Sequence, residues 1–295
     1  MKVPFDLPFR YKIAASVASV AATIAIGTAL LASGACSSDA TSPAPVANVI
    51  TVHGADFSYD APATIPAGMT TVNFVNDGPS LHQAQLVRLD SGKTITDLKT
   101  ALNQPGALPG WAVQLGGPNA VDAGLTANAT LNLAAGNYAL LCVVNVPGGV
   151  PHFMKGMVQP LTVTAAASGS HAAAALVADE TVTMDNYAFK LSAPLTAGTH
   201  TFKVSNPDQQ PHELELIRLA PGKTAADMLA WLQAQNGPPP RQALGGVAII
   251  SPASGPAYFT ATFTSGNYML LCFVFDSGDG KPHFAHGMVL PITIP

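Results

Sequence analysis

Charged residues are scarce in this sequence. Lysine, arginine, aspartate and glutamate account for 10% of the 295 residues, the formal net charge is −4, and no long run of either sign occurs. Electrostatic binding to nucleic acid needs a basic patch, so nucleic acid is not expected as a partner. Hydrophobic residues account for 48% of the chain, which excludes a disordered protein and supplies cores for two domains of ordinary size.

Cysteine is also rare, with three residues in the whole chain: Cys36, Cys142 and Cys272. Three thiols form one disulfide at most, so a disulfide framework is excluded. One interpretation is a single bridge between Cys142 and Cys272. The other is a metal-ligand role for each of them, which the residues that follow them favour.

The first 35 residues are typical of an export signal. Positive charges come first, at Lys2, Arg10 and Lys12, and an almost wholly apolar run follows at residues 13–31. Small side chains then lead up to the first cysteine. This order predicts a signal peptide over residues 1–35.

Cys36 directly follows that segment, and residues 32–36 (Ala-Ser-Gly-Ala-Cys) resemble the lipobox of bacterial lipoproteins. The resemblance implies a lipid on Cys36 that anchors the protein to a membrane, with residues 36–46 as a flexible tether. Ser33 departs from the aliphatic residue that is usual at its place in the motif. Ordinary cleavage after Ala35 and an uncleaved membrane anchor are the alternatives.

The chain repeats itself after a shift of 130 residues. The repetition predicts a domain over residues 47–165 (repeat 1), a linker over 166–176 and a domain over 177–295 (repeat 2). The matched pairs include Asn76 with Asn206, His82 with His212, Leu86 with Leu216, Gly92 with Gly222, and Cys142 with Cys272.

Strand signals dominate both repeats. Short alternating or β-rich runs such as 72–75, 130–133 and 259–263 are separated by glycine and asparagine turns, which predicts a β-sandwich. Each repeat also carries one helical insertion, at 94–103 and 224–235, where a threonine cap precedes helix-forming residues. The predicted fold class is therefore all-β, with two tandem β-sandwich domains that each carry one short helix.

Each repeat closes with a cysteine, a glycine-rich loop, a histidine and a methionine, in that order. Thiolate, imidazole and thioether are the ligand types that favour copper. A lone buried cysteine is more often a small hydrophobic residue. The same ligand types twice in the same order outweigh that interpretation, and they predict a metal site in each repeat.

A second histidine lies upstream in each repeat, His82 in the first and His212 in the second. With the two-residue period of a strand, His212 shares a face with the core residue Leu214. Glu213 and Glu215 are therefore expected to face out. If the two strands are neighbours, the upstream histidine and the cysteine meet at the mouth of the core.

With this order of residues each repeat resembles a cupredoxin, the Greek-key β-sandwich of blue copper proteins, over nearly the whole exported chain. The resemblance implies two copper ions, each held by two histidines and a cysteine, with a methionine as the weak axial ligand. The loop from cysteine to histidine has nine residues in repeat 1 and ten in repeat 2. Small blue copper proteins have a shorter loop; copper nitrite reductases and some multicopper oxidases have a long one. The implied ligands are His82, Cys142, His152 and Met157 in repeat 1, and His212, Cys272, His283 and Met288 in repeat 2.

The neighbours of the two cysteines argue against an oxidase or a nitrite reductase. In copper nitrite reductases a histidine beside the ligand cysteine links it to a catalytic copper, but leucine, valine and phenylalanine flank Cys142 and Cys272 here. The sequence has no His-x-His pair, so a trinuclear copper cluster lacks its ligands. The chain is therefore predicted not to be an enzyme and to have no catalytic residues.

The predicted function is one-electron transfer through two mononuclear copper sites. A redox partner protein at the cell envelope is expected, with the chain exported to the periplasm or the outer surface and anchored through Cys36. Two alternatives stay open. One is storage or delivery of copper, with a copper donor or acceptor as the partner, and the other is a metal-free cupredoxin-like binding or structural module.

Overall fold

The computed structural model describes residues 47–104, 108–146, 149–166, 176–252 and 254–295. The predicted signal peptide and tether, the proposed lipid site Cys36 and residues 167–175 of the predicted linker lie outside the described residues. Among the helices in the described ranges, none is long and apolar enough to cross a membrane.

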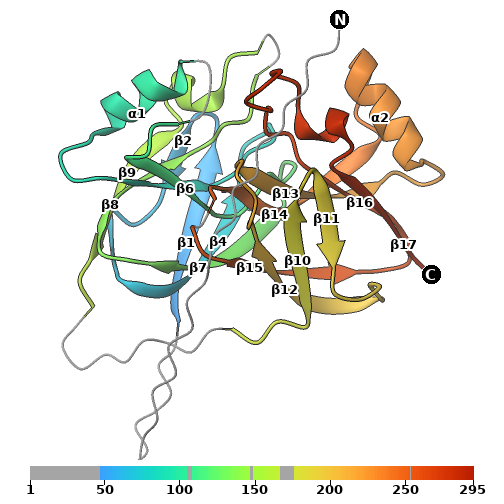
Figure 1. The fold of residues 1–295 in the computed structure, drawn as a ribbon, viewed down its shortest axis with the longest axis horizontal. Helices are drawn as coiled ribbons and strands as arrows, with labels where there is room; N and C mark the ends of the chain where they lie inside the picture. The colour runs from blue at the N-terminus through green and yellow to red at the C-terminus, as the bar shows by residue number, and fades with distance from the viewer. Residues whose placement is uncertain (1–46, 105–107, 147–148, 167–175, 253) are drawn as a thin grey trace, which may run out of the picture. The chain divides into compact units, whose positions relative to one another are not determined.

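Repeat 1 consists of short strands with one α-helix inserted between the fifth and sixth strands (Figure 1). The helix α1 spans Ile95–Leu102, and a short 3-10 helix spans His152–Lys155. The strands are β1 (Asn48–Ala55), β2 (Ser58–Asp60), β3 (Thr64–Pro66), β4 (Gly68–Asn76), β5 (Gln85–Leu89), β6 (Ala112–Gly116), β7 (Thr126–Leu133), β8 (Gly136–Leu141) and β9 (Val158–Thr164).

Repeat 2 follows the same plan. Its helix α2 spans Ala225–Ala234, and its short 3-10 helix spans His283–His286. The strands are β10 (Glu180–Asp185), β11 (Ala188–Leu191), β12 (Gly198–Ser205), β13 (His212–Leu219), β14 (Arg241–Ile250), β15 (Ala257–Phe263), β16 (Gly266–Leu271) and β17 (Val289–Ile294).

The strands form two sheets, and each sheet contains strands of both repeats. One has eight strands in the order β11-β10-β12-β15-β7-β4-β1-β2, and the other has nine in the order β17-β16-β13-β14-β6-β5-β8-β9-β3. The predicted all-β class, a β-sandwich with one short helix in each repeat, is confirmed for the described residues. The repeats join where β15 meets β7 and where β14 meets β6, so the sheets continue from one repeat into the other.

The contacts at the joint between β6 and β14 are reciprocal. Val121 pairs with His82 of repeat 1 and with Leu244 of repeat 2. Ile250 pairs in the same way with His212 of repeat 2 and with Leu115 of repeat 1. Each repeat therefore presents the same surface to the other.

Both helices begin where the sequence predicts. Thr94 caps α1: its side chain accepts a hydrogen bond from the backbone N–H of Asp97, whose carboxylate accepts one from the N–H of Thr94. Thr224 and Asp227 form the same capping box at α2. This pair of bonds satisfies two backbone donors that a helix start otherwise leaves without partners.

The helices explain why β8 and β16 are apolar on both faces. Tyr138 and Leu140 of β8 lie in the sandwich core, while Ala139 and Leu141 pack with Leu98 of α1 on the other face. In repeat 2, α2 covers β16 in the same way. Two-sided burial holds the end of each strand in place, directly before the cysteine.

Candidate metal centres

The first histidine and the cysteine of each site lie at or directly beside the ends of two neighbouring strands. In repeat 1, β5 pairs antiparallel with β8, and Gln85 lies opposite Leu141. His82 comes shortly before β5, and Cys142 directly follows β8. Antiparallel pairing thus brings the start of one strand to the end of the other, and the two residues meet there.

Backbone hydrogen bonds fold the long loop back onto the cysteine. The N–H of His152 donates to the carbonyl of Val144 over 2.8 Å, and the N–H of Phe153 donates to the carbonyl of Cys142 over 2.9 Å. The N–H of Cys142 donates to the carbonyl of Met157 over 3.1 Å. The loop of nine residues therefore returns the histidine and the methionine to the cysteine.

Three buried side chains converge in repeat 1, and we call His82, Cys142 and His152 site 1. The Nδ1 atoms of the two histidines are 3.0 Å apart. The Sγ atom of Cys142 lies 3.5 Å from Nδ1 of His152 and 3.9 Å from Nδ1 of His82. The exposed fraction of each of these residues is 1% or less.

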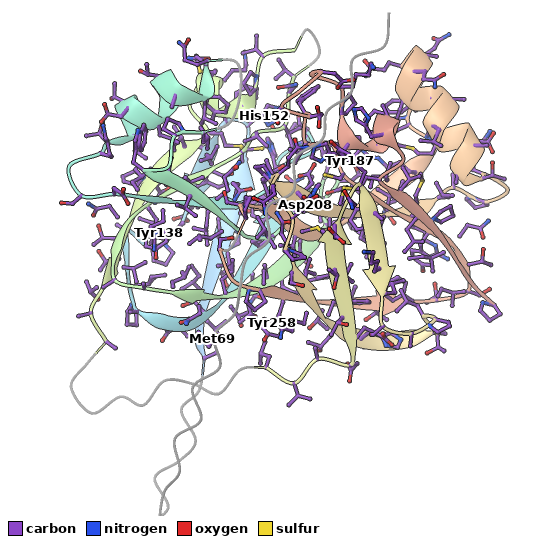
Figure 2. The ribbon with its side chains drawn as sticks, viewed as in Figure 1. Met69, Tyr138, His152, Tyr187, Asp208 and Tyr258 are labelled. Atoms are coloured by element: carbon purple, nitrogen blue, oxygen red, sulfur yellow. The ribbon has the colours of Figure 1, made fainter. Side chains whose placement is uncertain are left out.

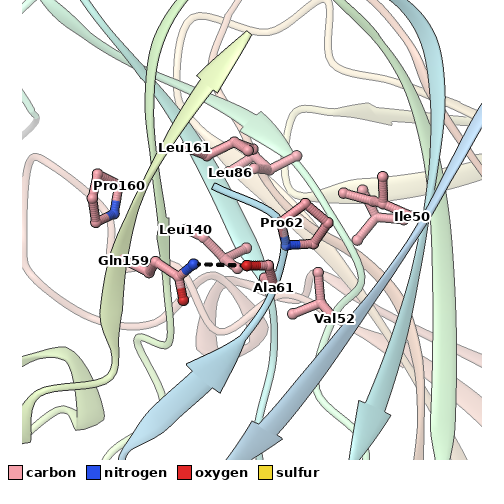
Figure 3. Close-up of a pocket in the computed structure, with 10 residues that line it drawn as sticks. Ile50, Val52, Ala61, Pro62, Leu86, Leu140, Gln159, Pro160 and Leu161 are labelled. Carbon is pink, nitrogen blue, oxygen red and sulfur yellow. Dashed lines mark hydrogen bonds between the residues drawn. The ribbon is translucent and has the colours of Figure 1, made fainter. Parts of the chain in front are cut away.

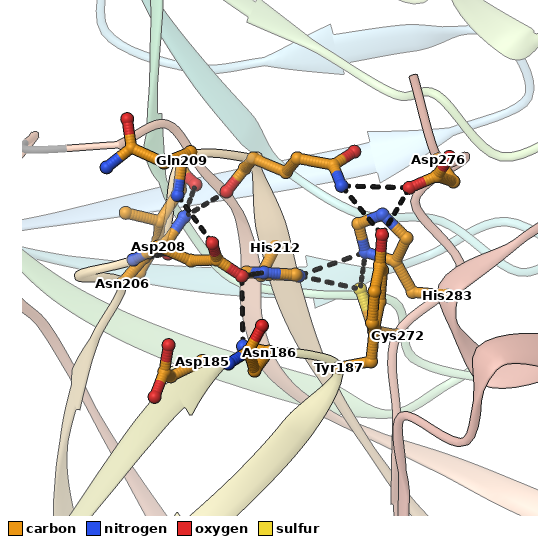
Figure 4. A network of polar contacts seen from close by, with 12 residues as sticks. Asp185, Asn186, Tyr187, Asn206, Asp208, Gln209, His212, Cys272, Asp276 and His283 are labelled. Carbon is orange, nitrogen blue, oxygen red and sulfur yellow. Dashed lines mark hydrogen bonds and ion pairs between the residues drawn. The ribbon is translucent and has the colours of Figure 1, made fainter. Parts of the chain in front are cut away.

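The same arrangement recurs in repeat 2, where His212, Cys272 and His283 form site 2 (Figure 4). The two Nδ1 atoms are 2.9 Å apart. The Sγ atom of Cys272 lies 3.4 Å from Nδ1 of His283 and 3.9 Å from Nδ1 of His212. All three residues are fully buried.

The predicted methionines lie beside these donors. Met157 and Met288 are fully buried. Each donates its backbone N–H to the carbonyl of the second histidine, over 3.0 Å, and accepts the N–H of the cysteine. The backbone of each methionine is therefore hydrogen-bonded to two residues of its site. The axial role of the methionine sulfur stays a prediction.

The two thiols are buried and unpaired, so the disulfide interpretation does not hold for Cys142 and Cys272. Burial raises the pKa of Cys142 to about 12 and also raises the pKa of Cys272. Burial, together with the second imidazole beside each ring, lowers the pKa of His152 and of His283 to about 4. The two histidines are therefore neutral at pH 7 and have a lone pair available for a metal.

An aspartate fixes the ring of the first histidine in each site. The Nε2 atom of His82 lies 2.5 Å from the carboxylate of Asp56, and that of His212 lies 2.8 Å from the carboxylate of Asp208. Such a contact selects the tautomer with the proton on Nε2, which leaves Nδ1 free to bind a metal. Neither aspartate was predicted as a site residue from the sequence.

The two aspartates come from non-equivalent positions. Asp208 lies four residues before its histidine, where repeat 1 has Gly78. Asp56 lies in the turn between β1 and β2, where repeat 2 has Asn186. A side chain at Gly78 would place its Cβ 2.9 Å from Nε2 of His82 and 3.0 Å from Asp56, so the glycine leaves room for the aspartate.

An aromatic ring lies against the second histidine of each site. Phe57 meets His152 edge-on at 5.0 Å between ring centroids, and the matching residue Tyr187 meets His283 at 5.1 Å. Tyr187 also donates its hydroxyl to Asp276. His152, Tyr187 and Asp208 lie towards one end of the strands, away from Met69 and Tyr258 (Figure 2).

The donor set fits copper in both repeats. Metal–nitrogen and metal–sulfur bonds of about 2.0 and 2.3 Å hold two donors on one ion at most about 4.3 Å apart, and each measured donor pair lies within that limit. Two imidazoles and a thiolate are the donors of mononuclear copper electron-transfer sites. The chain therefore has two copper sites, one in each repeat.

Glu213 and Glu215 do not face out, contrary to expectation. Their exposed fractions are 6% and 4%, because repeat 1 covers this face of β13. Asn119 of repeat 1 donates to Glu213 over 3.4 Å, and the N–H of Ala120 donates to Glu215 over 3.2 Å. Alternation along the strand is intact; the second repeat occupies the side where solvent was expected.

A small apolar cavity lies in the core of repeat 1, away from site 1 (Figure 3). Val52, Leu86 and Leu140 contribute to its wall, and Gln159 donates to the carbonyl of Ala61 over 3.1 Å at its rim. The cavity measures about 10 Å³. This volume is close to the minimum for one water molecule, so the cavity has no room for a ligand.

Neither a family model nor a curated protein sequence matches the chain. Among solved structures, an auracyanin from Roseiflexus castenholzii is 22% identical over 40% of this chain and 98% of its own, with a TM-score of 0.28. A blue copper oxidase from Nitrosomonas europaea is 15% identical over 84% of this chain and 86% of its own, with a TM-score of 0.26. The resemblance to blue copper proteins expected from the sequence thus recurs among solved structures.

The prediction that the chain is not an enzyme is contradicted. Five of the matching solved structures cover 84% of the chain and are named as copper oxidases or nitrite reductases. One of them is a copper nitrite reductase from Nitrosomonas europaea, 10% identical over 93% of its own length, with a TM-score of 0.24. The prediction relied on the residues beside Cys142 and Cys272. Those residues exclude one way of linking a metal site to a catalytic copper, not every kind of catalysis. We therefore withdraw the prediction.

Proposed function

We propose that the protein transfers single electrons through its two mononuclear copper sites. The observation that supports this most is the convergence of two imidazole nitrogens and one thiol sulfur, with 2.9–3.9 Å between donors, in both repeats. Bound copper supplies a one-electron couple at such a donor set. The remaining chemistry is that of the chain's own residues.

Those residues hold the donors still. Aspartates orient His82 and His212, and backbone hydrogen bonds tie each loop to the residue that carries the thiol. Side chains held in this way move little when one electron is gained or lost, which favours electron transfer. Burial of all three donors also keeps water off the site.

The cellular setting is part of the proposal. We place the protein at the cell envelope, exported by residues 1–35 and anchored by a lipid on Cys36, and we expect a redox partner protein there. The motif around Cys36 supports this placement. Mass spectrometry of the mature protein from a membrane fraction tests it, because a diacylated Cys36 gives a distinct mass and a Cys36→Ala variant does not.

Absorption spectroscopy tests the function itself. Mature protein loaded with Cu(II) is expected to show an intense visible band from charge transfer between the cysteine sulfur and copper, with two coppers per chain. Cys142→Ser and Cys272→Ser are each expected to remove one copper and about half of the band. His200→Ala is the control, since His200 contacts Thr196 at the surface and no site residue.

Two results would overturn electron transfer in favour of the alternatives. A colourless protein that binds Cu(I) would indicate storage or delivery of copper. A folded protein that takes up no copper would indicate a metal-free binding module.

A further inference from the structure

The two repeats differ in charge at the residue that follows the first histidine. Repeat 1 has Gln83 there and repeat 2 has Glu213. Both side chains are buried, with exposed fractions of 3% and 6%. The predicted ligands are of the same residue types in both sites, so this pair is a difference in charge directly beside two sets of matching donors.

Glu213 lies directly against the thiol of site 2. Its backbone N–H donates to Sγ of Cys272 over 3.4 Å. Its Oε1 atom accepts a hydrogen bond from the N–H of Phe273, the residue after the cysteine, over 3.0 Å. The carboxylate is therefore fixed beside the residue whose sulfur would bind copper.

Repeat 1 holds the second carboxylate oxygen. The Nδ2 atom of Asn119 donates to Oε2 of Glu213 over 3.4 Å and to the carbonyl of Leu214 over 3.2 Å. The carbonyl of Val247 also accepts from this atom, over 3.4 Å. Because three acceptors face it, two of them backbone carbonyls, it is the amide nitrogen of Asn119. Both oxygens of Glu213 thus accept N–H hydrogen bonds, which is the arrangement of an ionised carboxylate.

The equivalent position in repeat 1 carries no charge. The Nε2 atom of Gln83 is buried and has no hydrogen-bond partner among the described residues. The residue that corresponds to Asn119 in repeat 2 is Ala248: the N–H of Asn119 donates to the carbonyl of Gly246, and the N–H of Ala248 donates to that of Gly117. The asymmetry therefore extends to both partners of the contact.

We propose that Glu213 lowers the reduction potential of site 2 below that of site 1, so that an electron entering at site 2 passes on to site 1. A negative charge in a buried, weakly polarisable setting stabilises the more positive, oxidised form of a metal centre over the reduced form. The transfer is balanced within the chain: site 2 is oxidised by one electron, site 1 is reduced by it, and no proton moves. The proposal rests on the proposed electron-transfer function.

Single-site proteins allow each potential to be measured separately. Cys272→Ser leaves site 1, and Cys142→Ser leaves site 2. Each protein is loaded with copper and titrated through its visible band against redox mediators, with both proteins at the same pH. Site 2 is expected to have the lower potential.

Exchange of the two residues then tests the cause. Glu213→Gln in the site 2 protein is expected to raise the potential, and Gln83→Glu in the site 1 protein is expected to lower it, each by at least a tenfold change in the reduction equilibrium, which is 59 mV for one electron. Glu215→Gln is the matched control, because Glu215 is buried at the same contact but bonds Ala120 rather than the residues around Cys272. Circular dichroism verifies the fold of every variant.

The possible outcomes separate this inference from the proposed function. Equal reduction potentials at the two sites would refute the role of Glu213 and leave electron transfer in place. Reduction potentials that change with neither Glu213→Gln nor Gln83→Glu would do the same. A shift with Glu215→Gln as large as with Glu213→Gln would also refute it, because the effect would then not depend on the contact of Glu213 with Cys272 and Phe273. The absence of a reversible one-electron couple in either single-site protein would refute the proposed function instead.

Discussion

The carboxylate of Asp208 lies 2.8 Å from Nε2 of His212, four residues further along the chain. His82 makes the same contact with Asp56, which is 26 residues away in sequence. The two repeats therefore make the same aspartate–histidine contact with aspartates from different sequence positions. This contact is the basis of the first two predictions.

Removal of the Asp208 charge is expected to weaken copper binding at site 2. Loss of a carboxylate that orients a ligand histidine typically costs about 10–100-fold in metal affinity. We predict that Asp208→Asn has this effect in a competition titration with a copper chelator, in the Cys142→Ser background. Asp185→Asn, which breaks a surface pair with Lys190, should leave the affinity unchanged. Equal affinities for both variants would contradict the prediction.

A glycine substitution is expected to have a similar effect on site 1 without replacing any predicted ligand. Gly78→Ala places a Cβ within about 3 Å of both His82 and Asp56, so their contact must open. We predict weaker copper binding in the Cys272→Ser background, measured by the same titration. Gly110→Ala is the control, since its Cβ would meet nothing within 4 Å.

The stability of the metal-free protein is expected to fall on acidification. His152 and His283 titrate near 6.5 in the unfolded chain and near 4 in the folded protein, so the unfolded state binds more protons between these values. Stability is therefore complete above about pH 6.5 and is lost as the pH falls towards 4. We predict a decreasing Tm over this range and a shallower decrease in His152→Gln/His283→Gln. An unchanged slope in the double variant, relative to His200→Gln, would contradict this origin.

Copper uptake is expected to release protons from the thiols. Burial raises the pKa of Cys142 to about 12, so the thiol is protonated at neutral pH and must lose its proton when it binds copper. We predict at least one proton released per copper bound, measured by calorimetry in buffers with different ionisation enthalpies. Copper uptake without proton release would show that the sulfur does not bind copper.

The helix α1 is expected to stabilise the strand that leads to site 1. Leu98 is fully buried against β8, and truncation of a buried leucine costs about 2–5 kcal/mol. We predict a loss of this size for Leu98→Ala in urea unfolding. Thr96→Ala, an exposed position on the same helix, should change the free energy of unfolding by less than about 0.5 kcal/mol.

Internal repetition made the site residues predictable to a large extent. His82, Cys142 and His152 stood out because their types and order recur 130 residues later, and the structure brings them together. The helix starts at Thr94 and Thr224 were also predictable, because a capping box is a local signal.

The remaining features depend on contacts that local patterns do not contain. The comparison of the two repeats did not identify Asp56 and Asp208 as site residues, because they occupy non-equivalent positions. Glu213 and Glu215 were placed on the solvent side because alternation along a strand tells which residues share a face, not what covers it. Only the packing of one repeat on the other shows that this face is buried.

The reciprocal pairing of Val121 with Leu244 and of Ile250 with Leu115 has a consequence for the origin of the chain. A contact in which each half uses the same surface is the contact of a two-fold symmetric dimer. A single ancestral repeat could therefore have assembled with a second copy through this surface before duplication joined the two in one polypeptide. Once joined, the two halves were free to diverge, and the exchange of glutamine for glutamate beside one thiol is a difference that identical subunits could not have acquired.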